Sequence, residues 1–83
     1  MRSIEINTTP SCPDCRFLKG WLNAMALKYV EYDLTRSDIA EEAKRRTGVR
    51  IAPITIFDNT VIVGPVAEHI KRIKSLLGIK RAA

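Results

Sequence analysis

Both cysteines of the chain lie in one short motif, Cys12-Pro13-Asp14-Cys15. Two sulfurs separated by two residues can close a small disulfide ring or help to bind a metal ion. As a thiolate, a cysteine attacks disulfides, and a second cysteine nearby can then release the product. The motif therefore predicts thiol–disulfide exchange or metal binding, and the segments around it must distinguish the two.

The segments on either side of the motif predict a strand before it and a helix after it. Residues 3–7 are rich in β-branched side chains, and residues 8–11 have the composition of a turn. Pro13 suits the first position of a helix. The apolar residues that recur at helical spacing after the motif are Phe17, Leu18, Trp21, Leu22 and Met25. We therefore expect Cys12 at a helix N-terminus, where free backbone N–H groups and the helix dipole stabilise a thiolate.

Two charged residues are expected to tune this pair. Asp14 lies in the first turn of the helix, and its carboxylate opposes a nearby thiolate, so it should raise the pKa of Cys12 relative to a motif with a neutral residue there. Arg16 acts in the opposite direction. A strongly oxidising protein needs a highly stabilised thiolate, so Asp14 favours a reductant.

Metal binding is the main alternative. A closed structural zinc site needs four ligands, and the chain supplies two cysteines and one histidine, His69. His69 follows an acidic residue in the last helix and is expected at the surface. A zinc or iron–sulfur site would then need ligands from two chains. The alternative function is a dimeric metal or iron–sulfur carrier ligated through Cys12, and no metal ligand is predicted within a single chain.

The rest of the chain predicts four further elements and a final helix. A strand is expected at 29–34 and a helix at 38–47, with residues 35–38 capping the helix and Gly48 ending it. Residues 54–57 and 61–63 read as a β-hairpin, and a helix follows the Gly64-Pro65 break. The apolar stripe of that helix is Val66, Ile70, Ile73 and Leu77.

This order predicts an α/β fold. A helix joins the first two strands, so they should be parallel with a right-handed crossover, whereas the last two should form an antiparallel hairpin. We expect one domain, residues 1–83, with a βαβαββα order and a four-stranded mixed sheet covered by helices on both faces. The cysteine motif then lies beyond the carboxyl end of the first strand, where open α/β sheets place their sites.

The composition of the chain argues against a membrane-spanning segment and against a nucleic-acid partner. No apolar run approaches the ~20 residues of a membrane span, and the N-terminus has no secretory pattern, so a cytoplasmic location is expected. The protein is also expected to be a monomer. The net charge is +5, and its excess lies towards the C-terminus without interleaved aromatic residues, which disfavours nucleic-acid binding. These basic residues are Lys71, Arg72, Lys74, Lys80 and Arg81. A basic interaction module with incidental cysteines remains a third interpretation, and it predicts that function survives loss of Cys12.

Taken with the element order, four segments resemble the thioredoxin fold, and most closely the small glutaredoxins and glutaredoxin-like thioredoxins. The matching segments are the cysteine motif, Glu31-Tyr32-Asp33-Leu34, Ile51-Ala52-Pro53 where the family carries Thr-Val-Pro, and residues 61–64 before the last helix. The resemblance spans nearly the whole chain. It implies that Pro53 is cis and lies beside the cysteine pair.

The resemblance also implies roles for the site residues. Cys12 is the expected nucleophile, and Cys15, one helical turn further and more buried, is the expected resolving cysteine. Pro13, Asp14 and Arg16 tune the pair. The substrate side is expected to comprise Ala52 and Pro53, whose backbone edge can pair with an extended peptide, together with Arg50 and Gly64.

The expected function is a dithiol–disulfide oxidoreductase that reduces protein disulfides and holds no bound cofactor besides its own Cys12–Cys15 disulfide. It would be recharged by a flavoenzyme resembling thioredoxin reductase or by glutathione as co-substrate. Glutaredoxins often carry a lysine where this chain has Thr9, a tyrosine where it has Asp14, and an acidic pair where residues 64–67 have none. Arg50 does match a position that contacts the glutathione carboxylate in the family. The electron source therefore stays open at this point.

Overall fold

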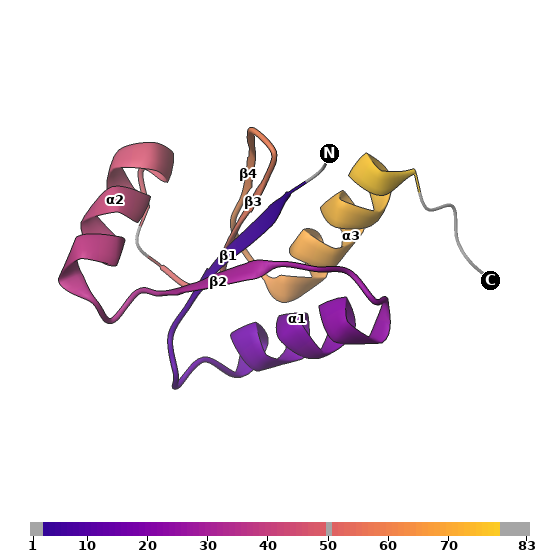
Figure 1. Ribbon diagram of the computed structural model, residues 1–83, viewed down its shortest axis with the longest axis horizontal. Coiled ribbons are helices and arrows are strands. Elements are labelled where there is room, and N and C mark those ends of the chain that lie inside the picture. The colour runs from indigo at the N-terminus through magenta and orange to yellow at the C-terminus, as the bar shows by residue number, and fades with distance from the viewer. Residues whose placement is uncertain (1–2, 50, 79–83) are drawn as a thin grey trace.

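The seven predicted elements are present in the predicted order (Figure 1). The computed structural model describes residues 3–49 and 51–78. The elements are β1 (Ile4–Thr8), α1 (Pro13–Ala24), β2 (Val30–Asp33), α2 (Ser37–Thr47), β3 (Ile54–Phe57), β4 (Thr60–Ile62) and α3 (Val66–Leu77). The α/β prediction with a βαβαββα order is confirmed.

The strands form one mixed sheet in the order β2-β1-β3-β4. β1 pairs with β2 in parallel, and the β1–β3 and β3–β4 pairs are antiparallel, as predicted for the crossover and the hairpin. Asn7 near the end of β1 lies opposite Ile54 at the start of β3. The cysteine motif follows β1 and Pro53 precedes β3, so this register brings both segments to the same end of the sheet.

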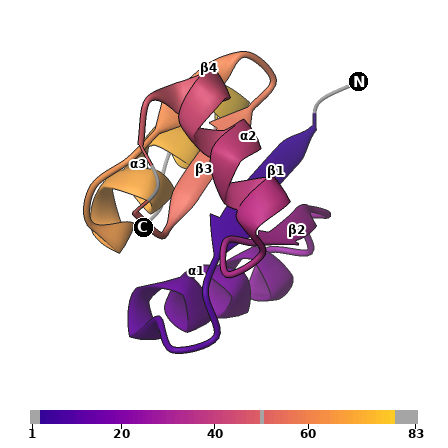
Figure 2. The same cartoon turned by 90° about the vertical axis from the view of Figure 1, so that its left-hand side faces the viewer.

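Helices cover both faces of the sheet (Figure 2). Helices α1 and α3 pack on one face, where the buried side chains form the larger core cluster. Its fully or nearly buried members are Ile4, Ile6, Leu18, Leu22, Phe57, Ile62 and Ile73. Helix α2 covers the other face, over a smaller cluster of Leu34, Ala43, Ile54 and Ile56. Because alternate side chains of a strand point to opposite faces, β3 contributes to both clusters.

The helix ends follow the sequence signals with one exception. Gly48 ends α2 with φ of 84°, the left-handed conformation that glycine adopts at little cost, as predicted. The capping prediction for residues 35–38 is wrong, because α2 begins after Arg36, whose side chain makes no capping bond. Instead, the Asp33 carboxylate accepts hydrogen bonds from the backbone and the hydroxyl of Thr35, at 2.9 and 2.6 Å. A side chain one turn earlier therefore fixes the loop into α2.

None of the helices in the described part of the chain combines the length and the apolar character needed to cross a membrane.

Candidate active site

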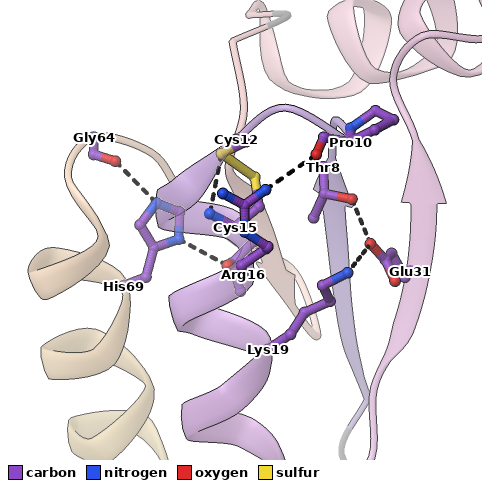
Figure 3. The surroundings of a disulfide bond; sticks show 10 residues. Thr8, Pro10, Cys12, Cys15, Arg16, Lys19, Glu31, Gly64 and His69 are labelled. Atoms are coloured by element: carbon purple, nitrogen blue, oxygen red, sulfur yellow. Dashed lines mark hydrogen bonds and ion pairs between the residues drawn. A yellow bond between two sulfur atoms is a disulfide. The ribbon is translucent and has the colours of Figure 1, made fainter.

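The two cysteines form a disulfide at the N-terminus of α1 (Figure 3). Cys12 is the N-cap residue and Pro13 occupies the first helical position, as predicted, and the Cα atoms of Cys12 and Cys15 lie 5.2 Å apart. The Cys15 backbone N–H donates to the Cys12 sulfur at 3.0 Å. Cys15 is 1% exposed, whereas Cys12 is partly exposed. Cys12 is therefore the cysteine that is open to solvent, and its sulfur accepts a hydrogen bond from a backbone N–H group at the helix N-terminus.

The two charged residues among the predicted tuning residues, Asp14 and Arg16, lie on either side of Cys15 and are both exposed. Asp14 is the acidic residue of the first helical turn. The Arg16 guanidinium donates to the Pro10 carbonyl at 3.2 Å, so it also closes the turn that leads into the motif. This contact to the preceding turn was not predicted from the sequence. The effect of either charge on Cys12 stays a prediction.

A hydrogen-bonded group beneath the motif was also missed by sequence reasoning. The Thr8 hydroxyl donates to the Glu31 carboxylate at 2.5 Å, and the Lys19 ammonium reaches the same oxygen at 3.0 Å. These bonds hold the pKa of Glu31 below its ordinary value, with the Thr8 bond as the main cause. They tie the end of β1 to β2 and to α1, and so fix the strand-to-helix turn that carries Cys12.

A shallow apolar groove of about 280 Å³ lies around the proline that precedes β3. The Ala52–Pro53 peptide bond is cis, as the resemblance implied. The residues that line the groove are Val49, Ile51, Ala52, Pro53, Val63 and Gly64. Three of the four predicted substrate-side residues, Ala52, Pro53 and Gly64, are therefore brought together. The fourth, Arg50, lies outside the described residues.

The surface prediction for His69 is wrong. The side chain is fully buried, with Nδ1 2.7 Å from the Thr55 hydroxyl and Nε2 3.1 Å from the Gly64 carbonyl (Figure 3). Helical geometry explains the burial, because His69 follows Val66 by three residues and precedes Ile73 by four, which places it on the apolar stripe. The charged neighbours in the sequence point elsewhere around the helix. The 3–4 spacing was the signal that could have identified it.

Burial lowers the pKa of His69 below its ordinary value, although the Gly64 carbonyl, Asp14 and Glu68 oppose the shift. The unfolded chain takes up this proton near pH 6.5, whereas the folded protein resists it. The associated stability is fully present above about pH 6.5 and is lost as the pH falls through that value towards the folded-state pKa. We expect the free energy of unfolding to fall by up to about 1.4 kcal/mol per pH unit there.

Urea unfolding between pH 7.5 and 5 would measure this dependence. Since His69 is the only histidine in the chain, His69→Gln should remove the part of the slope that burial of the imidazole causes. Equal slopes for the two proteins would contradict the prediction.

Metal-ligating side chains do not gather elsewhere in the described ranges. Within residues 3–49 and 51–78, no three or more histidine, cysteine, aspartate or glutamate side chains lie close enough together to hold a metal ion. A carrier ligated through Cys12 would therefore need ligands from a second chain or from outside these ranges.

Comparison with known proteins agrees with this geometry. The family model described as glutaredoxin matches residues 4–62. A solved thioredoxin-like protein, BC3987, is 24% identical, with a TM-score of 0.78 over 89% of this chain and 99% of its own. A wheat glutaredoxin is 20% identical, with a TM-score of 0.72 over 90% of this chain and 76% of its own.

An archaeal glutaredoxin, from Archaeoglobus fulgidus, is 14% identical, with a TM-score of 0.75 over 93% of this chain and 87% of its own. At these identities the likeness to solved structures establishes the fold. A search of curated protein sequences gave no match.

Proposed function

The chain belongs to the glutaredoxin family of thiol–disulfide oxidoreductases, and from this premise we propose that it reduces protein disulfides through Cys12 and Cys15. The observation that carries the proposal is the asymmetry of the disulfide. Cys12 is partly exposed at the N-cap of α1, and Cys15 is buried behind it. A substrate sulfur can approach Cys12 from solvent, while Cys15 is held within reach of Cys12 and away from other thiols.

In the first step, the Cys12 thiolate of the reduced protein attacks one sulfur of the substrate disulfide. The substrate S–S bond breaks, a bond forms between Cys12 and that sulfur, and the other substrate sulfur leaves as a thiolate that takes up a proton. The N-terminal position on α1 and the Cys15 N–H group favour the Cys12 thiolate as attacking species.

In the second step, the Cys15 thiolate attacks Cys12. The bond between Cys12 and the substrate sulfur breaks, and the Cys12–Cys15 bond forms. The substrate sulfur that had been bonded to Cys12 leaves as a thiolate, which takes up a proton. Two electrons have then passed from the dithiol to the substrate. The structure corresponds to the oxidised protein at the end of this step.

The groove at Pro53 is the proposed binding site for the polypeptide chain of the substrate. Its lining is apolar, and Ile51 and Val63 are 79% and 43% exposed, so an extended segment beside a disulfide can cover apolar surface here. The backbone at Ala52 and Pro53 precedes β3 and offers an edge for main-chain hydrogen bonds. Arg50 stays a proposed contact for the carboxylate of a substrate or of glutathione.

The source of electrons for the protein can be identified by comparing its catalytic turnover with two recharging systems. Reduction of insulin disulfides would be followed with catalytic amounts of the protein, recharged either by glutathione with glutathione reductase or by NADPH with thioredoxin reductase. The proposal requires turnover with at least one system, and the faster one identifies the class of reductant. Absence of turnover with both, together with a visible iron–sulfur absorption band after anaerobic purification, would favour the carrier instead.

Asp14 is proposed to make the pair more reducing. Asp14→Asn removes a carboxylate from the first turn of α1, so the pKa of Cys12 should fall by up to about one unit. The couple should become more oxidising by up to about 30 mV. The ultraviolet absorbance of the thiolate as a function of pH measures the first change, and equilibration with a glutathione redox buffer measures the second.

Asp38→Asn is the matched control, because Asp38 is also an exposed aspartate in the first turn of a helix, on α2. It should leave both values unchanged. An unchanged Cys12 titration in Asp14→Asn would refute the tuning role.

A further inference from the structure

The partners of His69 fix its tautomer. The Gly64 carbonyl can only accept a hydrogen bond, so Nε2, at 3.1 Å, must carry a proton. In the neutral ring Nδ1 is then an acceptor, and the Thr55 hydroxyl donates to it at 2.7 Å. The burial that lowers the pKa of His69 favours this neutral ring over the imidazolium, while Asp14 on α1 and Glu68 on α3 act against that preference.

The two hydrogen-bond partners of His69, Thr55 and Gly64, lie in the two segments that flank the proposed substrate groove. Thr55 is fully buried on β3, two residues after Pro53. Gly64 lines the groove and adopts a φ of 100°, a conformation that few side-chain-bearing residues tolerate. His69 therefore links β3, which begins directly after Pro53, to the loop that contains Gly64.

The loop that contains Gly64 leads directly into α3. Pro65 follows Gly64 and is the N-cap residue of α3, but it has no backbone N–H and no capping side chain. The Pro65 carbonyl accepts from the N–H groups of Glu68 and His69, at 3.0 and 3.4 Å, whereas the Gly64 carbonyl accepts from the imidazole. Among the hydrogen bonds of residues 3–49 and 51–78, the imidazole of His69 supplies the only one to the Gly64 carbonyl.

We propose that His69 is a positioning residue for the substrate groove: its Nε2–H group holds the Gly64 carbonyl and keeps the Val63–Gly64 side of the groove in place opposite Pro53. A substrate chain then binds to a preformed surface and does not have to order the loop on binding. This inference rests on the proposed function, because it takes the groove as the substrate site.

Two variants of similar polarity distinguish the contributions of the two hydrogen bonds that His69 makes. The longer amide of His69→Gln can place its N–H group where Nε2 lies and keep the bond to Gly64. The shorter amide of His69→Asn can reach only the Nδ1 position, near Thr55. We expect KM for a disulfide-containing peptide to rise about three- to tenfold in His69→Asn, which matches loss of one hydrogen bond. It should stay within about twofold of the wild type in His69→Gln, and kcat should change little in both.

Lys71→Gln, an exposed change on the same helix, is the control and should leave KM unchanged. Equal KM values for His69→Gln and His69→Asn would overturn the proposal, because a merely structural role depends on filling the buried space and not on which bond is kept. Urea unfolding of each variant confirms that it is folded under the assay conditions.

A spectroscopic measurement on the wild-type protein does not depend on catalysis. Long-range ¹⁵N–¹H spectra of the imidazole should place the proton on Nε2, and the ¹³C shift of the Gly64 carbonyl should change in His69→Asn but not in His69→Gln. A proton on Nδ1, or an unaltered Gly64 carbonyl in His69→Asn, would refute the positioning role. If the wild type reduces no disulfide, the proposed function fails, while these spectra still decide whether His69 holds the loop.

Discussion

Cys12→Ser is expected to abolish disulfide reduction, with a fall in turnover of at least about a thousandfold. Activity requires a covalent bond between the protein and a substrate sulfur, and a serine hydroxyl cannot form one. Loss of a catalytic nucleophile elsewhere costs up to about a millionfold in kcat, so a thousandfold is a lower bound. The measurement is insulin reduction with whichever recharging system supports the wild-type protein.

The fold should tolerate this change well. Serine is among the preferred N-cap residues, and its hydroxyl oxygen can accept from the Cys15 N–H group as the Cys12 sulfur does. A disulfide that closes so short a loop removes little entropy from the unfolded chain. Reduced wild-type protein is the proper reference for the stability of Cys12→Ser.

Turnover of Cys12→Ser within tenfold of the wild type would contradict the catalytic prediction. It would support the interpretation in which the cysteines are incidental.

Leu18→Ala should lower the stability of the protein more than any surface change. The Leu18 side chain is fully buried in the cluster between α1, α3 and the sheet. Removing it costs about 2–5 kcal/mol through lost apolar burial and the remaining cavity. In a domain of this size a loss of about 3 kcal/mol lowers Tm by roughly 10–25 °C. Thermal unfolding followed by circular dichroism measures the effect.

Phe17→Ala is a matched control from the adjacent position on α1. Phe17 is 62% exposed, so its removal should change the free energy of unfolding by less than about 0.5 kcal/mol. If the two variants lost equal stability, the assignment of Leu18 to the core and Phe17 to the surface would be wrong.

The course of the chain could be predicted because its signals are local. Alternating β-branched residues, a proline after Cys12 and a glycine at position 48 each act within one or two turns, and each gives the element expected of it. The cis bond at Pro53 was different, because it followed from the resemblance to a family and not from the residues alone.

The parts that could not be predicted depend on contacts between distant segments. The sheet order places β1 between β2 and β3, and the Thr8–Glu31 hydrogen bond joins residues 23 apart in the sequence. His69 was misplaced for another reason. Its charged neighbours in the sequence suggested a surface, whereas its spacing from Val66 and Ile73 places it on the buried face of α3, and only the spacing reflects the geometry of a helix.

The division of roles between the two cysteines is the central claim, and trapping tests it most directly. Reduced Cys15→Ser protein would be mixed with a disulfide-containing peptide, and the products would be identified by mass spectrometry before and after addition of a reductant. We predict a stable mixed disulfide on Cys12, released by the reductant, and no such adduct when Cys12→Ser is treated in the same way. An adduct on Cys15 of the Cys12→Ser protein, with none on Cys12 of the Cys15→Ser protein, would contradict the account.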